Sequence, residues 1–95
     1  SSDDIILSSL AKGCTGDAYM ELGDTDNAMD AYENAIENSA NELTAPRFMM
    51  KLAMIHETNG DYADALEIYN SIKTDYKGAR EANGIDKYIA RAENR

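Results

Sequence analysis

The chain is poor in the residues that usually build metal centres and covalent cross-links. Its 95 residues include one cysteine, one histidine, one proline and no tryptophan. A single cysteine excludes an intramolecular disulfide, and one histidine with one cysteine cannot complete the usual zinc set. No apolar run approaches the ~20 residues of a membrane span. The composition therefore predicts a small domain without cross-links, zinc centre or spanning helix.

Positive charge is scarce in the first half of the chain. Residues 1–45 carry ten acids and one base, a net charge of −9, whereas residues 46–95 carry eight of each, a net charge of zero. Nucleic-acid binding needs a basic footprint on the phosphate backbone, and a basic cluster near the end of a chain is more typical of a solvated helix. That cluster comprises Lys73, Lys77, Arg80, Lys87, Arg91 and Arg95. We predict no nucleic-acid partner.

No motif for catalysis or cofactor binding is present. The acidic run that begins at Asp24 has Met29 and Ala35 where a calcium loop needs glycine and glutamate, and no glycine-rich phosphate loop follows a strand. We expect Cys14 to be a small buried hydrophobic residue on an apolar helix stripe, and His56 to be a core or half-buried residue. The prediction is therefore no enzyme, no cofactor and no metal.

The central feature of the sequence is an internal repeat with an offset of 37 residues. The pattern Gly16-x2-Tyr19-x3-Gly23-x4-Ala28-x3-Tyr32-x2-Ala35 recurs as Ala53-x2-His56-x3-Gly60-x4-Ala65-x3-Tyr69-x2-Ile72. Spacings of three and four place these residues on one face of a helix before the middle glycine and of a helix after it. Each copy is thus a helical hairpin, and a fixed period is the signature of a stacked repeat architecture.

The boundaries follow from caps and turn residues. Gly23 and Gly60 supply the turn that ends the first helix of each hairpin, and Asp24 and Asp61 can cap the second helix. A connection from Ala40 to Ala45 precedes the second hairpin, with Thr44 as its cap. We expect helices over about residues 3–22, 25–39, 45–59 and 62–74, and a closing helix over about 78–93 with a kink at Asn83-Gly84. The repeat units span about residues 9–39 and 46–76.

At these residues the chain resembles the tetratricopeptide repeat family, whose pattern has a small residue, an aromatic, a turn glycine, alanine, an aromatic and alanine in this order. The resemblance implies an all-α superhelix of two hairpins and a closing helix, and a non-catalytic protein–protein interaction module. It also implies that the first helix of each hairpin lines a concave groove for a peptide or partner helix. Carried over to this chain, that face holds Leu10, Gly13, Asp17, Met20 and Glu21, then Arg47, Met50, Met54 and Glu57.

The chemistry of this face indicates the kind of partner. Methionine side chains adapt their shape to varied apolar ligands, while Met49 lies on the core side. The family's clamp for acidic chaperone tails needs basic and amide groups, but Gly13, Asp17, Met50 and Met54 occupy those places. The resemblance therefore implies an acidic, methionine-lined groove for a neutral or basic apolar segment.

Two further expectations concern the setting of the domain. The ending Ile85 to Ala92 is similar to the C-terminal part of membrane-anchored bacterial envelope proteins with such repeats, namely the ancillary subunit of the secretory translocon and outer-membrane assembly lipoproteins. This likeness implies a periplasmic scaffold or chaperone-like role, with a cytoplasmic location as the alternative. The chain begins without methionine, and we expect a piece of a longer protein. The alternative function is a structural segment of a solenoid that self-associates through Ile5, Ile6 and Leu7.

Overall fold

The secondary structure is entirely helical in the computed structural model, which describes residues 1–39 and 41–95. Within these ranges the elements are α1 (Ser2–Glu21), α2 (Thr25–Glu37), α3 (Ala45–Thr58), α4 (Tyr62–Asp75), the 3₁₀ turn η1 (Arg80–Ala82) and α5 (Ile85–Glu93). The predicted all-α class is confirmed. Ala40, where the expected connection between the hairpins begins, lies outside the described residues.

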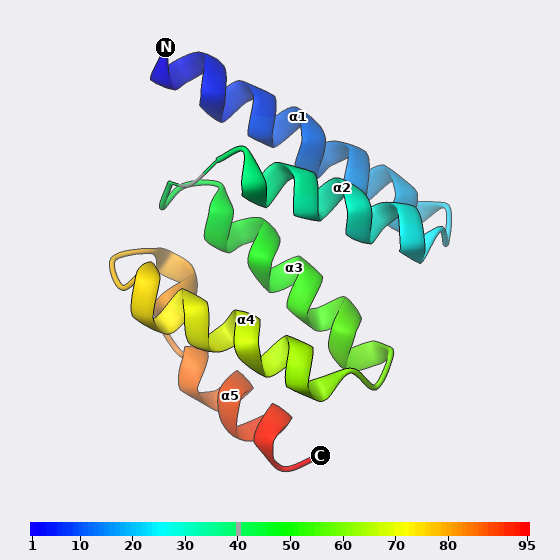
Figure 1. Cartoon of the computed structure of the whole chain (residues 1–95), viewed down its shortest axis with the longest axis vertical. Helices are drawn as coiled ribbons and strands as arrows, with labels where there is room; N and C mark the ends of the chain where they lie inside the picture. The colour runs from blue at the N-terminus through cyan, green and yellow to red at the C-terminus, as the bar shows by residue number, and fades with distance from the viewer. Residues whose placement is uncertain (40) are drawn as a thin grey trace.

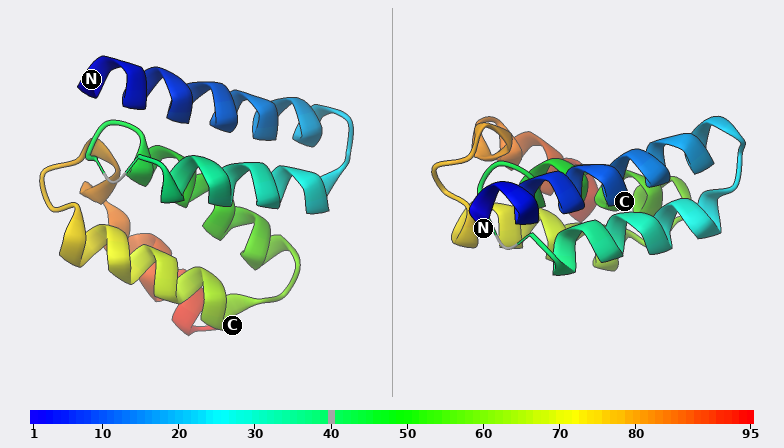
Figure 2. Two further views of the ribbon diagram at one scale, coloured as in Figure 1. Left: turned by 45° about the horizontal axis from the view of Figure 1, so that its top comes forward. Right: turned by 90° about the horizontal axis from the view of Figure 1, so that it is seen from above.

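The helices pack in chain order into a flat stack. Figure 1 shows α1 at one end and α5 at the other, and the views of Figure 2 show α1 and α2 running antiparallel from a tight turn. Contacts join mainly α1 with α2, α2 with α3, α3 with α4 and α4 with α5, and the stack measures 41 × 32 × 16 Å. Among the described helices, none has the length and apolar character needed to cross a membrane.

The two hairpin turns have the same backbone but different caps. Gly23 and Gly60 have φ angles of +76° and +84°, a left-handed conformation that favours glycine and ends the preceding helix. Asp24 then accepts a hydrogen bond from the Asn27 N–H at 3.3 Å and caps α2. Asp61 occupies the same place before α4 but makes no side-chain cap bond, so the expected second cap is wrong.

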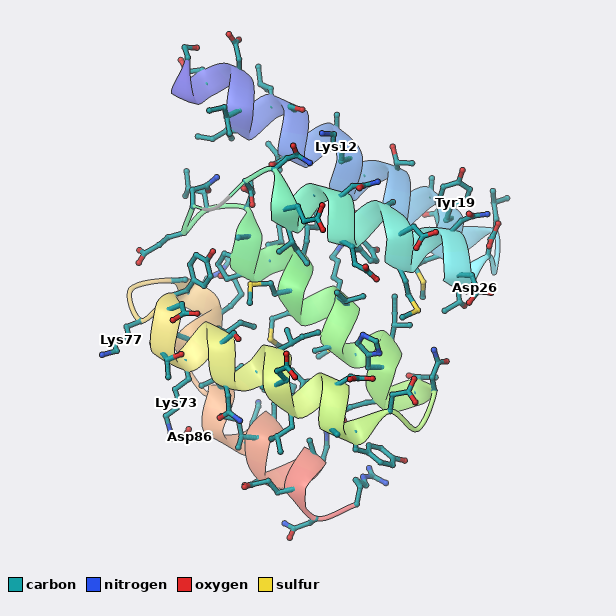
Figure 3. All side chains as sticks on the ribbon, in the orientation of Figure 1. Lys12, Tyr19, Asp26, Lys73, Lys77 and Asp86 are labelled. Carbon is teal, nitrogen blue, oxygen red and sulfur yellow. The ribbon has the colours of Figure 1, made fainter. Side chains whose placement is uncertain are left out.

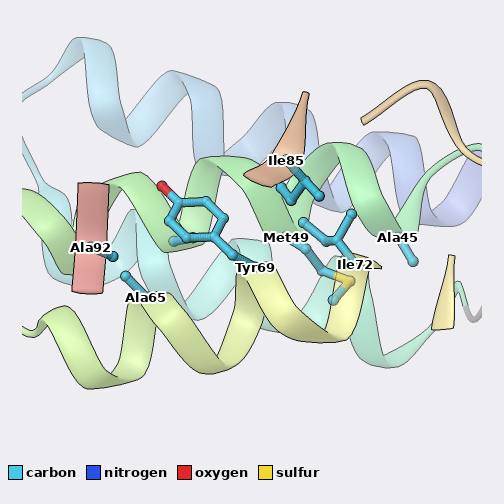
Figure 4. Packing of buried hydrophobic residues seen from close by; sticks show 8 residues of the cluster. Ala45, Met49, Ala65, Tyr69, Ile72, Ile85 and Ala92 are labelled. Carbon is cyan, nitrogen blue, oxygen red and sulfur yellow. The ribbon is translucent and has the colours of Figure 1, made fainter. Parts of the chain in front are cut away.

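The second hairpin and α5 enclose one of two hydrophobic clusters (Figure 4). Tyr69, at 0% exposure, lies at the centre of this cluster, with Ile72 and Ile85 nearby. The other cluster joins α2 to α3 and contains Ala28, Tyr32, Ala35, Phe48, Leu52 and Ile55. Each cluster therefore holds the second helix of one hairpin against the helix that follows it.

Helix α1 packs through small residues rather than large apolar ones. A Cβ atom added at Gly13 would lie 1.9 Å from the Phe48 ring, and one at Gly16 would lie 2.6 Å from the Tyr32 ring. Ser9 is fully buried and donates a hydrogen bond to the Ala35 carbonyl at 3.2 Å. Glycine at these two places lets aromatic rings from α2 and α3 lie directly against the α1 backbone.

The buried face of α1 explains why the expectation for Cys14 is wrong. Cys14 is exposed, because α1 carries apolar residues on two faces and the small residues, not the stripe with Cys14, face the core. Thr44 is buried at the expected N-cap position of α3, but its side chain makes no cap hydrogen bond, and its Oγ1 instead donates to Asn41 Oδ1 at 3.1 Å.

The closing helix is shorter than expected. The segment from residue 78 forms η1 first, and α5 begins only at Ile85. Asn83 is extended and Gly84 has a φ angle of +75°, so the helix breaks where the kink was predicted. The break turns α5 so that its apolar face lies on α4.

Candidate functional site

The residues predicted to line the groove differ widely in exposure. Met20 and Met54 are exposed at 41% and 39%, and the charged residues Glu21 and Arg47 are exposed as well. These four side chains are accessible to a partner.

The remaining predicted residues are engaged within the fold. Leu10 and Met50 are half-buried, and each packs against one of the two hydrophobic clusters. Gly13 lies beneath the Phe48 ring and is closed to a ligand. Asp17 and Glu57 are only partly exposed, and each is bound by other side chains of the chain.

Asp17 is the acceptor in the first of two similar networks. Tyr32 Oη donates to Asp17 Oδ1 at 2.5 Å, and Lys51 Nζ donates to the same oxygen at 2.7 Å. Partial burial by itself raises the pKa of Asp17, but the hydrogen bonds from Lys51 and Tyr32, with the charges of Lys51 and Arg47, hold this pKa below its usual value. The carboxylate is therefore ionised at neutral pH and already has a cationic partner.

Glu57 is the acceptor in the second network. Arg91 donates from Nη2 to Glu57 Oε1 at 2.7 Å and from Nε to Oε2 at 3.0 Å, and Tyr69 Oη donates to Oε1 at 2.5 Å. The hydrogen bond from Arg91 lowers the pKa of Glu57 more than burial raises it, and Tyr69 lowers it further. Only 10% of the Glu57 side chain is exposed, so its carboxylate is largely shielded from water, whereas 42% of the Arg91 side chain in this bidentate pair is exposed.

The two networks share one plan. In each network, a carboxylate on the first helix of a hairpin accepts hydrogen bonds from the tyrosine of the second helix and from a basic side chain on the helix that follows the hairpin. Lys51 follows Asp17, and Arg91 follows Glu57, by 34 residues. Each network therefore links three consecutive helices. Its central carboxylate, Asp17 or Glu57, is one that the sequence alone had assigned to the groove.

A hollow of about 370 Å³ lies beside the second network. Its lining residues come from α3, α4 and α5 and the chain end, and they are Met54, Glu57, Thr58, Tyr62, Arg91 and Arg95. The Arg95 guanidinium lies 6.0 Å from the centre of the Tyr62 ring, a distance at which cations and aromatic rings attract. Tyr62, Arg91 and Arg95 were not among the residues predicted to form a site. The 34-residue spacing from carboxylate to base was the only available signal for Arg91.

Helical hairpins with glycine turns, stacked in chain order, define a helical-repeat protein. A family model described as tetratricopeptide repeat matches residues 15–82, which is most of the chain. The chain therefore belongs to the tetratricopeptide repeat family. Neither a search of curated proteins nor a search of solved structures gives a match. Membership suggests a protein–protein interaction module, because repeats of this family are typically non-enzymatic, and nothing in the described part of the chain shows catalysis.

Proposed function

We propose that this domain binds an extended peptide or a partner helix along the face formed by α1 and α3, without catalysing a reaction. The observation that carries the proposal is the exposure of Met20 and Met54, at 41% and 39%, on the face formed by α1 and α3. Met54 also lines the 370 Å³ hollow, which gives a bound side chain a place to enter. Flexible, polarisable methionines suit apolar partners of varied shape.

The charges on this face favour a largely apolar partner. Asp17 is neutralised by Lys51 and Glu57 by Arg91, so these acids contribute less negative potential than their number implies. Glu21 is the predicted groove acid that stays exposed. We therefore propose a neutral or mildly basic apolar segment, held mainly by contacts with the methionines. An envelope scaffold or chaperone-like role, suggested by Ile85 to Ala92, agrees with such a client.

The proposal is tested with peptides selected on the folded domain from a random display library. Dissociation constants of the selected peptides are then measured for the wild type and for Met20→Glu and Met54→Glu. A buried charge opposite an apolar ligand is costly, so we expect at least tenfold weaker binding in each variant. Both positions are exposed, so the unfolding free energy should change little.

Leu43→Glu serves as the matched control, because Leu43 is 71% exposed and lies in the connection between the hairpins. This variant should bind the selected peptides like the wild type. Peptides that bind all three variants with wild-type affinity would show that the α1 and α3 face is not the binding site.

A second function, as a structural segment that associates with a further helical unit, is favoured by the outer face of α1. On α3, Phe48, Leu52 and Ile55 pack on the preceding hairpin. The residues 37 places later, Ile85, Ile89 and Ala92, pack in the same way from α5. The residues 37 places earlier, Ala11, Thr15 and Ala18, are exposed on α1. Nearby apolar side chains are exposed too, namely Ile5 at 51%, Leu7 at 63% and Leu22 at 79%.

This second proposal predicts concentration-dependent association. Replacing Leu7 and Leu22 with serine should leave a monomer at concentrations where the wild type associates, as measured by sedimentation velocity. Ile6 is half-buried beside Ser39 and Asn41, so it is left unchanged to preserve the fold. Equal association of the variant and the wild type would contradict the proposal.

A further inference from the structure

His56 has an unsatisfied polar atom in the interior of the second hairpin. Its side chain is 16% exposed, and its Nδ1 atom is shut off from solvent without a hydrogen-bond partner. Buried polar atoms are nearly always paired, so an imidazole nitrogen in this state needs an explanation. Nitrogen in a neutral imidazole is also the commonest side-chain ligand for metal ions.

Two carboxylates converge on this imidazole. Asp61 Oδ2 lies 3.9 Å from His56 Nδ1, too far for a hydrogen bond. One ligand atom from each of His56, Asp61 and Asp64 lies within 4.8 Å of the other two. Two carboxylates at this separation repel each other, and a cation between them would remove that repulsion.

The first hairpin shows that this arrangement is not required by the fold. At the matching places, 37 residues earlier, the chain has Tyr19, Asp24 and Asn27. There Asp24 caps α2 and also accepts a hydrogen bond from Asn27 Nδ2 at 2.6 Å. In the second hairpin the amide is replaced by an acid and the tyrosine by histidine, and Asp61 no longer caps its helix.

We propose that His56, Asp61 and Asp64 bind one divalent transition-metal ion of the zinc class at the turn between α3 and α4. One imidazole nitrogen and two carboxylate oxygens form a donor set suited to such ions, whereas calcium and magnesium prefer oxygen alone. Tetrahedral bonds of ~2.0–2.1 Å place ligand atoms ~3.3 Å apart, so the present separations must contract. Asp61 and Asp64 are exposed, so we infer that their side chains rotate inward on binding and that water completes the coordination.

The ion joins the end of α3 to the start of α4, so binding should also stabilise the second hairpin. An ion that binds only the folded chain raises its unfolding free energy in proportion to the logarithm of the ion concentration. This site is separate from the peptide-binding face, and the inference does not depend on the proposed function.

The test uses untagged protein with Cys14→Ser, because the exposed thiol would bind zinc itself. His56 is the only histidine in the chain, so its imidazole gives a single set of NMR signals during titration with Zn²⁺. We expect these signals to shift and saturate at one ion per chain. The thermal unfolding midpoint should rise in the same titration.

Two variants copy the first hairpin, His56→Tyr and Asp64→Asn, and each removes one ligand. Loss of a ligand should weaken Zn²⁺ binding at least tenfold, since loss of a group that only supports a ligand already costs about 10- to 100-fold. Circular dichroism checks that His56→Tyr stays folded, and Asp64 is exposed, so its replacement preserves the fold in any case. Calorimetry provides the affinities of both variants.

Asp26→Asn is the control, because it removes an exposed acid from the first turn of α2. It should bind Zn²⁺ like the parent protein. The proposal is overturned if the imidazole signals do not move with millimolar Zn²⁺, or if His56→Tyr keeps the parent affinity. It is also overturned if Asp26→Asn weakens binding as much as Asp64→Asn, since the ion would then be attracted only by the acidic surface.

Discussion

Removing the Arg91 guanidinium should weaken the docking of α5 by destroying the bidentate pair with Glu57. Arg91→Met keeps much of the aliphatic stem but also removes the guanidinium carbon that lies 4.9 Å from the centre of the Tyr88 ring. Glu57→Gln keeps an acceptor for the Tyr69 hydroxyl but removes the charge. Combined in a double-mutant cycle, the two variants isolate the coupling energy of the pair.

The structure sets the expected size of this coupling. Hydrogen bonds to charged groups contribute about 1.5–3 kcal/mol, and exposed ion pairs typically about 0.2–1 kcal/mol. The Glu57 side chain is 10% exposed but that of Arg91 is 42% exposed, so solvent screens part of the interaction. We therefore expect a coupling of about 1–2 kcal/mol. In a domain of this size, each kcal/mol corresponds to about 4–8 °C in the unfolding midpoint.

A second ion pair between α4 and α5 provides the comparison. Lys73 Nζ and Asp86 Oδ1 are 2.7 Å apart, and Figure 3 shows both side chains on the surface where the two helices meet. Their side chains are 53% and 75% exposed, so a cycle of Lys73→Met and Asp86→Asn should give at most about 0.5 kcal/mol. Urea unfolding of all variants, with unchanged m-values, measures both couplings. Equal couplings would refute the reasoning that burial of Glu57 strengthens its pair.

Three further predictions concern single sites. The pKa values of Asp17 and Glu57 are lowered in the folded state, so their contribution to stability is present above the ordinary carboxyl pKa of about 4 and is lost as pH falls through the folded values. Asp17→Asn and Glu57→Gln should therefore each flatten the acid limb of the stability curve in urea titrations, and an unchanged limb would contradict this. Gly13→Ala should cost about 1–3 kcal/mol because its Cβ meets the Phe48 ring, although alanine is the better helix former; a gain in stability would disprove the close contact. The exposed Cys14 thiol should react with a maleimide as fast in the folded protein as in urea, and strong protection would be inconsistent with its position.

The repeat determined most of what the sequence could predict about the fold. Spacings of three and four around Gly23 and Gly60 predicted the hairpins correctly, because both turns require left-handed residues and the flanking apolar faces bury themselves. The face of α1 was harder to predict. An apolar stripe usually marks the buried side, but here glycine and serine face the core, because two aromatic rings from α2 and α3 fill the space that larger α1 side chains would take.

The site was less predictable than the fold, since it depends on how helices are placed relative to one another. Residue spacing assigned Asp17 and Glu57 to a face, but their partners Lys51 and Arg91 lie two helices further along the chain, on α3 and α5. Only the angle and register of those helices bring the charges together. The same holds for the hollow, in which Arg95 lies against Tyr62 from a different part of the chain.

The chain-order packing of the stack has a consequence for how the domain opens. Because contacts join mainly neighbouring helices, the molecule behaves as a short linear array, in which an end unit can detach without disturbing the middle. Helix α1 is attached through buried glycine and serine, the half-buried Leu10 and Tyr19 and the Asp17 network, whereas α5 inserts the buried Ile85 and Ala92 into a hydrophobic cluster. Fraying should therefore begin at the end helices, and the backbone amides of α1 should exchange with deuterium sooner than those of α3 and α4, which have a neighbour on both sides.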